Sequence, residues 1–290
     1  MDKAAKEIIR QAVRNRYGNI ANAGSVVSTI SPGGSCCGES ETAGGKNSAS
    51  ACCGGSDVSS EQLSALMGYS KEEFASVPEG ANMGLGCGNP VALASLQAGE
   101  TVVDLGSGGG FDCFLAAKQV GDAGRVIGVD MTPDMLSKAR ANAEKMQTKN
   151  VEFRLGEIEH LPVADNSTDI IMSNCVINLS PDKQKVYRDA FRILKPGGRL
   201  AISDIVAIAP LPEEIQQNLE LVSACVGGAS TFDETNDMLV KAGFEKIKIT
   251  PKDESRKLIS EWTAGDSKNA GDYVVSAYIE AVKPGTLELG

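Results

Sequence analysis

The stretch of this chain that could do chemistry is a glycine-rich loop between two acids. Asp104 ends a short apolar run, and Asp130 ends the next apolar run along the chain. Three glycines follow the first acid at alternate positions: Gly106, Gly108 and Gly110. Glycine adopts positive φ readily and lets a ligand approach the bare backbone. An acid at the end of the second strand is placed to bind ribose hydroxyls, so the pattern predicts a nucleotide-like ligand.

The glycine spacing indicates which kind of nucleotide this is. A dinucleotide fold requires G-x-G-x-x-G, so that a pyrophosphate can lie on the helix N-terminus. Phe111 takes the place of the third glycine here, and Asp104 stands directly before the loop. A carboxylate beside the glycines suits a cationic cofactor better than an anionic pyrophosphate. S-adenosylmethionine, with its sulfonium and α-amino groups, is the natural candidate, and an ordinary strand-to-helix turn is the alternative.

Cysteine is the second residue type that could do chemistry, and the chain has eight. Three of them stand alone at loop or strand ends, flanked by small residues: Cys87, Cys175 and Cys225. Cys113 follows the glycine loop on the next helix and fits an inert buried cysteine, although a disulfide role is open. In a cytosolic enzyme, cysteines are more often ligands or redox-active thiols than a disulfide framework.

The remaining four cysteines form two adjacent pairs in a stretch rich in Gly, Ser and Ala: Cys36, Cys37, Cys52 and Cys53. Zinc sites usually separate paired cysteines by two to four residues, so a zinc site is one of several possible interpretations of these pairs. The alternatives are capture of a soft ion, a reversible thiol buffer and a dispensable tail. The stretch is expected to be flexible, and the pairs are expected to assist capture without being required for catalysis.

Strands and helices alternate through the chain, which predicts an α/β fold with a mostly parallel sheet and helices on both faces. The expected strands are 101–104, 125–129, 151–155, 169–175 and 199–203, then an antiparallel pair at 244–250 and 273–282. The expected helices are 111–120, 135–146, 182–194, 213–224 and 232–242. Ligands in such sheets lie beyond the carboxyl ends of strands. Cys175 is at such an end, beside the predicted cofactor strand.

The flanking segments complete the expected domain organisation. An apolar stripe predicts a helix over residues 1–20, with its basic side chains on a solvated outer face. Residues 21–58 are expected to be a linker, 59–208 the cofactor-binding core, and 209–290 a substrate lid that also closes the sheet. His160, the only histidine, is expected in an exposed loop rather than as a base.

Three segments carry a family resemblance: LGLGCGNP around Cys87, SNCVINLSPDK around Cys175 and ACVGGA around Cys225. Together with DLGSGGGFDC, they resemble the arsenite S-adenosylmethionine methyltransferases, a class I methyltransferase family. The resemblance implies that the three cysteines bind trivalent arsenic as thiolates. It also implies that the cofactor is bound by Asp104, Gly106, Gly108, Gly110, Asp130, Met131, Gly156, Glu157, Ile158 and Asn174. The corner at 156–158 is expected against the adenine.

The implied substrates are arsenite and methylarsenite, and the implied partner is a thiol reductant, glutathione or thioredoxin. The net charge of −10 argues against a nucleic-acid substrate. No apolar run approaches the ~20 residues of a membrane span, and the charged N-terminus does not resemble a signal peptide. A cytoplasmic location is therefore expected.

Two other functions compete with arsenic methylation. A methyltransferase for another small organic acceptor, such as a quinone, would need an acid or base to deprotonate the acceptor. The three isolated thiols would then have no role. A thiol-based metal-binding protein that keeps a cofactor fold would have no methyl acceptor at all.

Overall fold

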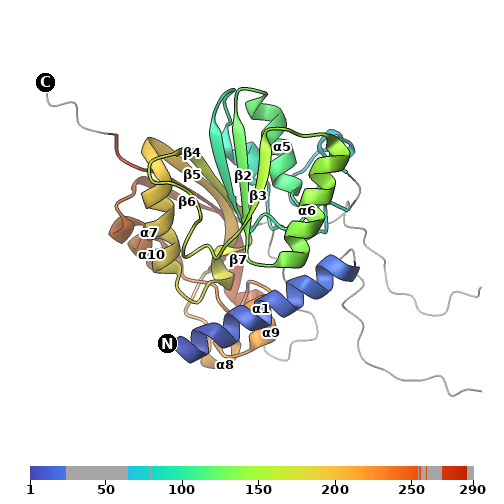
Figure 1. Ribbon diagram of the computed structural model, residues 1–290. Coiled ribbons are helices and arrows are strands. Elements are labelled where there is room, and N and C mark those ends of the chain that lie inside the picture. Colours follow the sequence, from blue (N-terminus) through green and yellow to red (C-terminus); the bar gives the residue numbers. More distant parts are fainter. Residues whose placement is uncertain (24–64, 79, 254, 256–258, 260–269, 286–290) are drawn as a thin grey trace, which may run out of the picture.

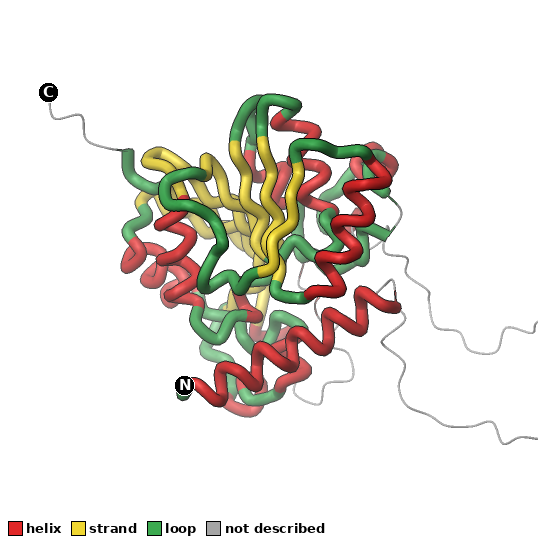
Figure 2. Tube along the Cα trace, viewed as in Figure 1, coloured by secondary structure: helices red, strands yellow, loops and turns green. Residues whose placement is uncertain are grey.

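The computed structural model describes residues 1–23, 65–78, 80–253, 255, 259 and 270–285. Residues 24–58 of the predicted linker, with its two cysteine pairs, lie outside this part of the chain, whereas its first residues, 21–23, belong to the N-terminal helix, which is longer than predicted. Figure 1 shows a central sheet with helices packed on both sides and a long N-terminal helix across one end. The same layers are seen in Figure 2, where the strands form one twisted layer between helices.

The sheet has seven strands in the order β3-β2-β1-β4-β5-β7-β6. Strands β1 to β5 pair in parallel, and β7 is antiparallel to both of its neighbours. The predicted α/β sheet with an antiparallel pair at its end is therefore confirmed. The strands are β1 Thr101–Leu105, β2 Arg125–Asp130, β3 Val151–Leu155, β4 Thr168–Asn174, β5 Leu194–Ala207, β6 Glu245–Lys252 and β7 Val274–Val282.

Helices cover both faces of the sheet. The elements are α1 Lys3–Ala23, α3 Lys71–Ala75, α4 Pro90–Ala94, α5 Phe111–Val120, α6 Pro133–Met146, α7 Lys183–Ile193, α8 Glu213–Gln216, α9 Leu219–Ser223 and α10 Phe232–Ala242, with short 3₁₀ turns η2 Ile177–Leu179 and η3 Ala270–Tyr273. One apolar core lies between the sheet and α5 and α6, with Phe114 wholly buried at its centre. A second core lies under α7 and α10, around Ile193 and Leu239.

Local signals explain where these helices begin and end. Pro133 occupies the first turn of α6, where its missing N–H costs nothing. Thr231 and Glu234 form a capping box at the start of α10, and Gly243 ends that helix with φ of 105°. These signals are in the sequence, and the predicted bounds of both helices agree with the structure to within two residues.

Two predicted bounds are wrong. β5 begins at Leu194 rather than Arg199, because the backbone of Gly197 and Gly198 pairs with Lys283 beyond β7 at 2.9 and 2.8 Å. The predicted helix over 213–224 is two short helices. Asn218 separates them, since its side chain accepts hydrogen bonds from the backbone at the start of α9.

The N-terminal helix lies across the carboxyl end of the sheet, beside α6 and α9 (Figure 1). Val13 and Ile20 are buried there. Within the described residues, no helix is both long enough and apolar enough to cross a bilayer.

Candidate functional site: a cofactor cavity beside three cysteines

A cavity opens at the carboxyl ends of β1, β2 and β4, where the sequence predicts the cofactor. Its lining includes every predicted cofactor residue except Gly110, Gly156 and Glu157. Of residues 156–158, which are expected against the adenine, only Ile158 therefore lines the cavity. A Cβ on Gly156 would come within 2.7 Å of Pro162, so close packing explains the glycine there.

The glycine loop leaves backbone open to the cavity. Gly108 has φ of 50°, and a Cβ added there would meet no atom closer than 3.8 Å. Open space above a left-handed glycine is what a ligand that touches the backbone needs. Gly110 differs, since a Cβ there would lie 2.8 Å from Phe114 and Phe153. A glycine is needed at position 110 because these side chains pack closely against the start of α5.

Asp130 holds the glycine loop against the next helix. One carboxylate oxygen accepts a hydrogen bond from the Gly108 N–H at 2.9 Å, and the other accepts one from Thr132 N–H at 2.8 Å. Burial raises the pKa of Asp130, and these backbone donors act in the opposite direction. Each oxygen keeps a lone pair for a ligand hydroxyl.

We expect Asp130→Ala to weaken cofactor binding by about 10- to 150-fold, the cost of losing hydrogen bonds to a charged group. Isothermal titration of S-adenosylmethionine into the variant measures this. Unchanged binding would contradict a role for Asp130 toward the ribose.

The cavity has the chemical character that a cationic cofactor requires. Asp104 and Asp130 are buried in its wall, and neither pairs with a lysine or arginine in the described part of the chain. The hydroxyl oxygen of Ser107 is also buried and has no hydrogen-bond partner among the residues that the structure describes. Buried polar groups are normally satisfied, so these groups fit a bound ligand that carries positive charge and hydrogen-bonding groups.

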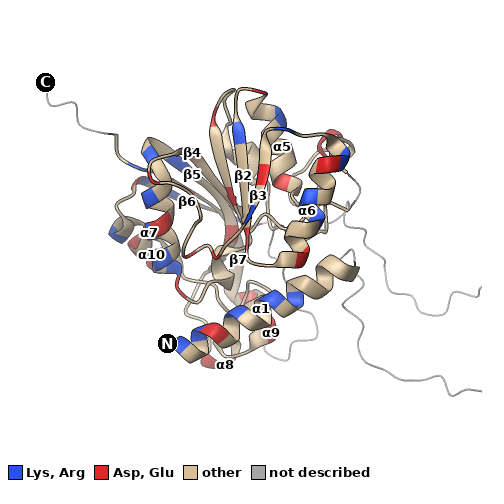
Figure 3. Ribbon diagram, viewed as in Figure 1, with Lys and Arg blue, Asp and Glu red and all other residues tan. Residues whose placement is uncertain are grey.

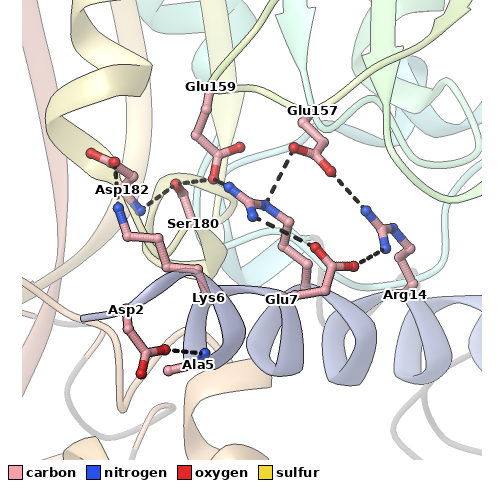
Figure 4. Close-up of polar contacts among 10 residues, drawn as sticks. Asp2, Ala5, Lys6, Glu7, Arg14, Glu157, Glu159, Ser180 and Asp182 are labelled. Atoms are coloured by element: carbon pink, nitrogen blue, oxygen red, sulfur yellow. Dashed lines mark hydrogen bonds and ion pairs between the residues drawn. The ribbon is translucent and has the colours of Figure 1, made fainter.

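Helix α1 forms one side of the cavity, which the sequence did not predict. Arg10 and Tyr17 line the cavity wall. The Arg10 guanidinium lies 3.2 Å from Glu159 and 3.3 Å from Glu157, and Ser180 donates a hydrogen bond to Glu159 at 2.8 Å. Figure 4 shows this cluster of contacts between α1 and the loops after β3 and β4.

The expectation that the basic side chains of α1 form a solvated outer face is wrong for three residues. Lys6 pairs with Asp182 at 2.6 Å, and Arg14 pairs with Glu157 at 2.7 Å, in addition to the contacts of Arg10. In Figure 3, acidic loops face the basic side of α1. Helix periodicity cannot reveal such partners, which lie 143 to 176 residues away in the sequence.

The three isolated cysteines meet beside the cofactor cavity. Cys87 and Cys175 form a disulfide with an S–S distance of 2.08 Å. The Cys225 thiol donates a hydrogen bond to the carbonyl oxygen of Cys175 at 2.7 Å. Cys175, which directly follows β4, lines the cavity itself. The structure thus brings together three cysteines that are far apart in sequence.

Two of these cysteines have unusual backbone conformations. Cys175 has φ of 55° and Cys225 has φ of 67°, a region that residues other than glycine seldom adopt. Such conformations persist only where the surrounding structure enforces them, and they cluster at functional sites. Cys113, by contrast, is buried within α5 and donates to Asp104 at 3.2 Å. It is a free core cysteine.

Asp204 is a member of the cysteine cluster that sequence analysis missed. Its carboxylate and the sulfurs of Cys87 and Cys175 all lie within 4.8 Å of one another. Burial raises its pKa to about 6, and hydrogen bonds from the backbone of Ile205 and Ile177 act against that rise. Its position just after the predicted strand 199–203 was a usable signal, because the same reasoning selected Cys175.

His160 is exposed, as predicted.

The fold and the cavity define a class I S-adenosylmethionine-dependent methyltransferase. A family model described as a methyltransferase domain matches residues 96–243, half of the chain. The chain is 51% identical over 96% of its length to an arsenite methyltransferase of Halobacterium salinarum, 67% of which it covers. It is 45% identical over 58% of its length to an arsenite methyltransferase of Aquipseudomonas alcaligenes, and it spans half of that protein.

A solved structure of an arsenic methyltransferase is also similar to this chain. The arsenic(III) S-adenosylmethionine methyltransferase of Chlamydomonas reinhardtii is 30% identical, with a TM-score of 0.56 over 78% of this chain and 74% of its own. The chain belongs to the arsenite methyltransferase family, and its cofactor is S-adenosylmethionine.

Proposed function

We propose that this protein transfers the methyl group of S-adenosylmethionine to trivalent arsenic held by Cys87, Cys175 and Cys225, a reaction that serves arsenic detoxification. The observation that carries the proposal is the meeting of these cysteines at the end of β4, where Cys175 also lines the cofactor cavity.

Trivalent arsenic is thiophilic, and three thiolates would surround it in a pyramid. Each thiol displaces one hydroxyl of arsenous acid as water. The arsenic lone pair then points away from the sulfurs and can attack a methyl group without deprotonation. S-adenosylmethionine supplies that electrophilic methyl group. The contribution of the protein is to hold the lone pair and the methyl carbon in line, where effective molarities of ~10⁵ M are reachable.

Methyl transfer raises arsenic from the trivalent to the pentavalent state, and two thiolates can supply the two electrons that return it to the trivalent state by forming a disulfide such as Cys87–Cys175. Arsenic binding by both sulfurs requires two electrons, which return the disulfide to two thiols. We propose glutathione or thioredoxin as the class of donor and, for the same reason, the reducing cytoplasm as the compartment.

The test of the proposed function is the release of S-adenosylhomocysteine with and without arsenite, followed by mass spectrometry of the products. Arsenite-dependent release with methylated arsenic is the expected result. Release with a quinone or phenol but not with arsenite would favour the competing methyltransferase. Arsenite binding without release would favour a metal-binding protein.

A second prediction concerns the reduced thiols directly. Arsenite is expected to protect Cys87, Cys175 and Cys225 of the reduced protein from alkylation, because each sulfur would be bound to arsenic. Peptide mass spectrometry after a short pulse of iodoacetamide measures the protection. Cys113 lies outside the cluster, where its thiol donates a hydrogen bond to Asp104, so its labelling is expected to be the same with and without arsenite. Equal labelling of the three cysteines in both samples would contradict a shared arsenic site.

A further inference from the structure

Asp112 is a buried carboxylate in the cofactor cavity, beside Asp104, Asp130 and Glu159, and lies outside the residues predicted from sequence. It lies in the first turn of α5, lines the cavity and is 8% exposed. The Tyr69 hydroxyl donates a hydrogen bond to one of its oxygens at 2.6 Å, and the Asn174 amide donates to the other at 3.1 Å. Two donors on two different elements therefore fix the orientation of this carboxylate.

The carboxylates of Asp112 and Asp104 lack a cationic partner among the described residues. Burial, and next the charge of Asp112, raise the pKa of Asp104, and burial raises the pKa of Asp112 to about 6. A buried carboxylate is costly unless it is paired. A cation in the cavity would offset this cost for both groups.

Asn174 places Asp112 on the side of the cavity that faces the cysteines. The same Asn174 amide donates to the carbonyl oxygen of Gly88 at 2.9 Å, and its side-chain oxygen accepts from the Cys87 N–H at 2.9 Å. Asn174 also directly precedes Cys175. The Asn174 side chain packs so closely on the Cys87 loop that a Cβ on Gly86 would lie 2.5 Å from the Asn174 side-chain nitrogen.

We propose that Asp112, oriented by Tyr69 and Asn174, recognises the positively charged sulfonium centre of the cofactor. The methyl group must face the arsenic-binding cysteines, so the sulfur that carries it lies at the same end of the cavity. Asp112 is the cavity carboxylate tied through Asn174 to the Cys87 loop. The inference rests on the proposed function, because the place of the methyl acceptor at the cysteines decides at which end of the cavity the sulfonium lies.

Recognition of the sulfonium has a consequence for selectivity. Methyl transfer converts the cationic cofactor into S-adenosylhomocysteine, whose sulfur is neutral, while the α-amino and carboxylate groups stay unchanged. A carboxylate that responds to the sulfonium therefore favours the methyl donor over the spent product. A carboxylate that binds the α-amino group, or one that only supports the fold, would not distinguish the two.

The experiment is calorimetric titration of Asp112→Asn with three ligands: S-adenosylmethionine, S-adenosylhomocysteine and sinefungin. Sinefungin carries an amine-bearing carbon in place of the methylated sulfur and is therefore also cationic at that position. The variant is expected to bind the two cationic ligands about 10- to 100-fold more weakly, because a charged contact is lost. Affinity for S-adenosylhomocysteine is expected to change by less than about 3-fold.

Two further variants complete the design. Tyr69→Phe keeps the carboxylate but removes one of its donors, so it is expected to give a smaller loss with the same preference for the cationic ligands. Asp122→Asn makes the same charge change at an exposed position beyond α5 and is expected to leave all three affinities unchanged. Thermal unfolding of each variant without ligand checks that the fold is retained.

An equal loss for all three ligands in both Asp112→Asn and Tyr69→Phe would overturn the proposal, as would no loss in Asp112→Asn. If Asp112→Asn fails to fold, Tyr69→Phe decides alone. The titrations contain no arsenic, so their failure leaves the methyl acceptor untouched. Failure of the unmodified protein to bind S-adenosylmethionine would instead contradict the proposed function.

Discussion

Replacement of Cys175 by serine is expected to abolish arsenite methylation while S-adenosylmethionine affinity stays unchanged. Serine offers arsenic a harder oxygen ligand that does not replace a thiolate. Even a misplacement of 1 Å can cost about 100-fold in rate, and loss of one thiolate removes one of the three bonds that would hold the arsenic in place. The assay is arsenite-dependent release of S-adenosylhomocysteine, with titration calorimetry to confirm cofactor binding.

Cys225→Ser is expected to give the same result, because its thiol touches the Cys175 backbone within the same cluster. Cys87→Ser is expected to stop the first methyl transfer but to spare a monomethyl substrate, which offers only two positions to thiols. Cys113→Ser is the matched control, since it removes a buried thiol outside the cluster and should retain arsenite turnover. Wild-type turnover in both Cys175→Ser and Cys225→Ser would rule out a shared arsenic site.

Gly106→Ala is expected to destabilise the fold and disturb both halves of the site. Gly106 has φ of 72°, and a Cβ there would lie 2.4 Å from the Val176 side chain. Val176 directly follows Cys175, so relief of this clash moves the cysteine as well as the cofactor loop. Left-handed backbone costs a non-glycine residue about 1–2 kcal/mol, and overpacking adds about 1–3 kcal/mol.

Gly99→Ala isolates the contribution of the clash. Gly99 has φ of 87°, yet a Cβ there would meet nothing within 4 Å. Urea unfolding should therefore show only the backbone cost for Gly99→Ala, with normal cofactor affinity. Gly106→Ala should show a larger loss of stability and weaker binding of both cofactor and arsenite. Equal effects of the two substitutions would mean that the Val176 side chain moves aside without loss of stability or of ligand binding.

The parts of the site that sequence analysis predicted are those with a local signal. Asp104 and Cys175 were each identified because they end an apolar run, and parallel strands place such ends at one edge of the sheet. The mostly parallel sheet was predicted from the alternation of strands with helices. Only the family resemblance, however, indicated that Cys87, Cys175 and Cys225 would meet.

The parts that sequence analysis missed depend on contacts between distant segments. Asp112 lies inside the quoted cofactor motif, but its orienting partner Tyr69 comes from a separate loop before it. In the sequence, Arg10 is one of several basic residues on a helix, and only the fold shows that it pairs with Glu159. The extension of β5 likewise depends on Lys283. No periodicity within one element encodes such a pairing.

The contacts of α1 also have a consequence for the order of assembly during synthesis. Its ion pairs reach Glu157, Glu159 and Asp182, and its Tyr17 hydroxyl donates to the carbonyl oxygen of Ser223 at 3.5 Å. The helix is synthesised before all of these partners, which belong to the later part of the chain. Contacts of such high sequence separation form late in folding. Helix α1 is therefore among the last helices to dock although it precedes its partners in the chain, and the cofactor cavity gains its α1 wall only after the segments that contain Glu157, Glu159, Asp182 and Ser223 have been made.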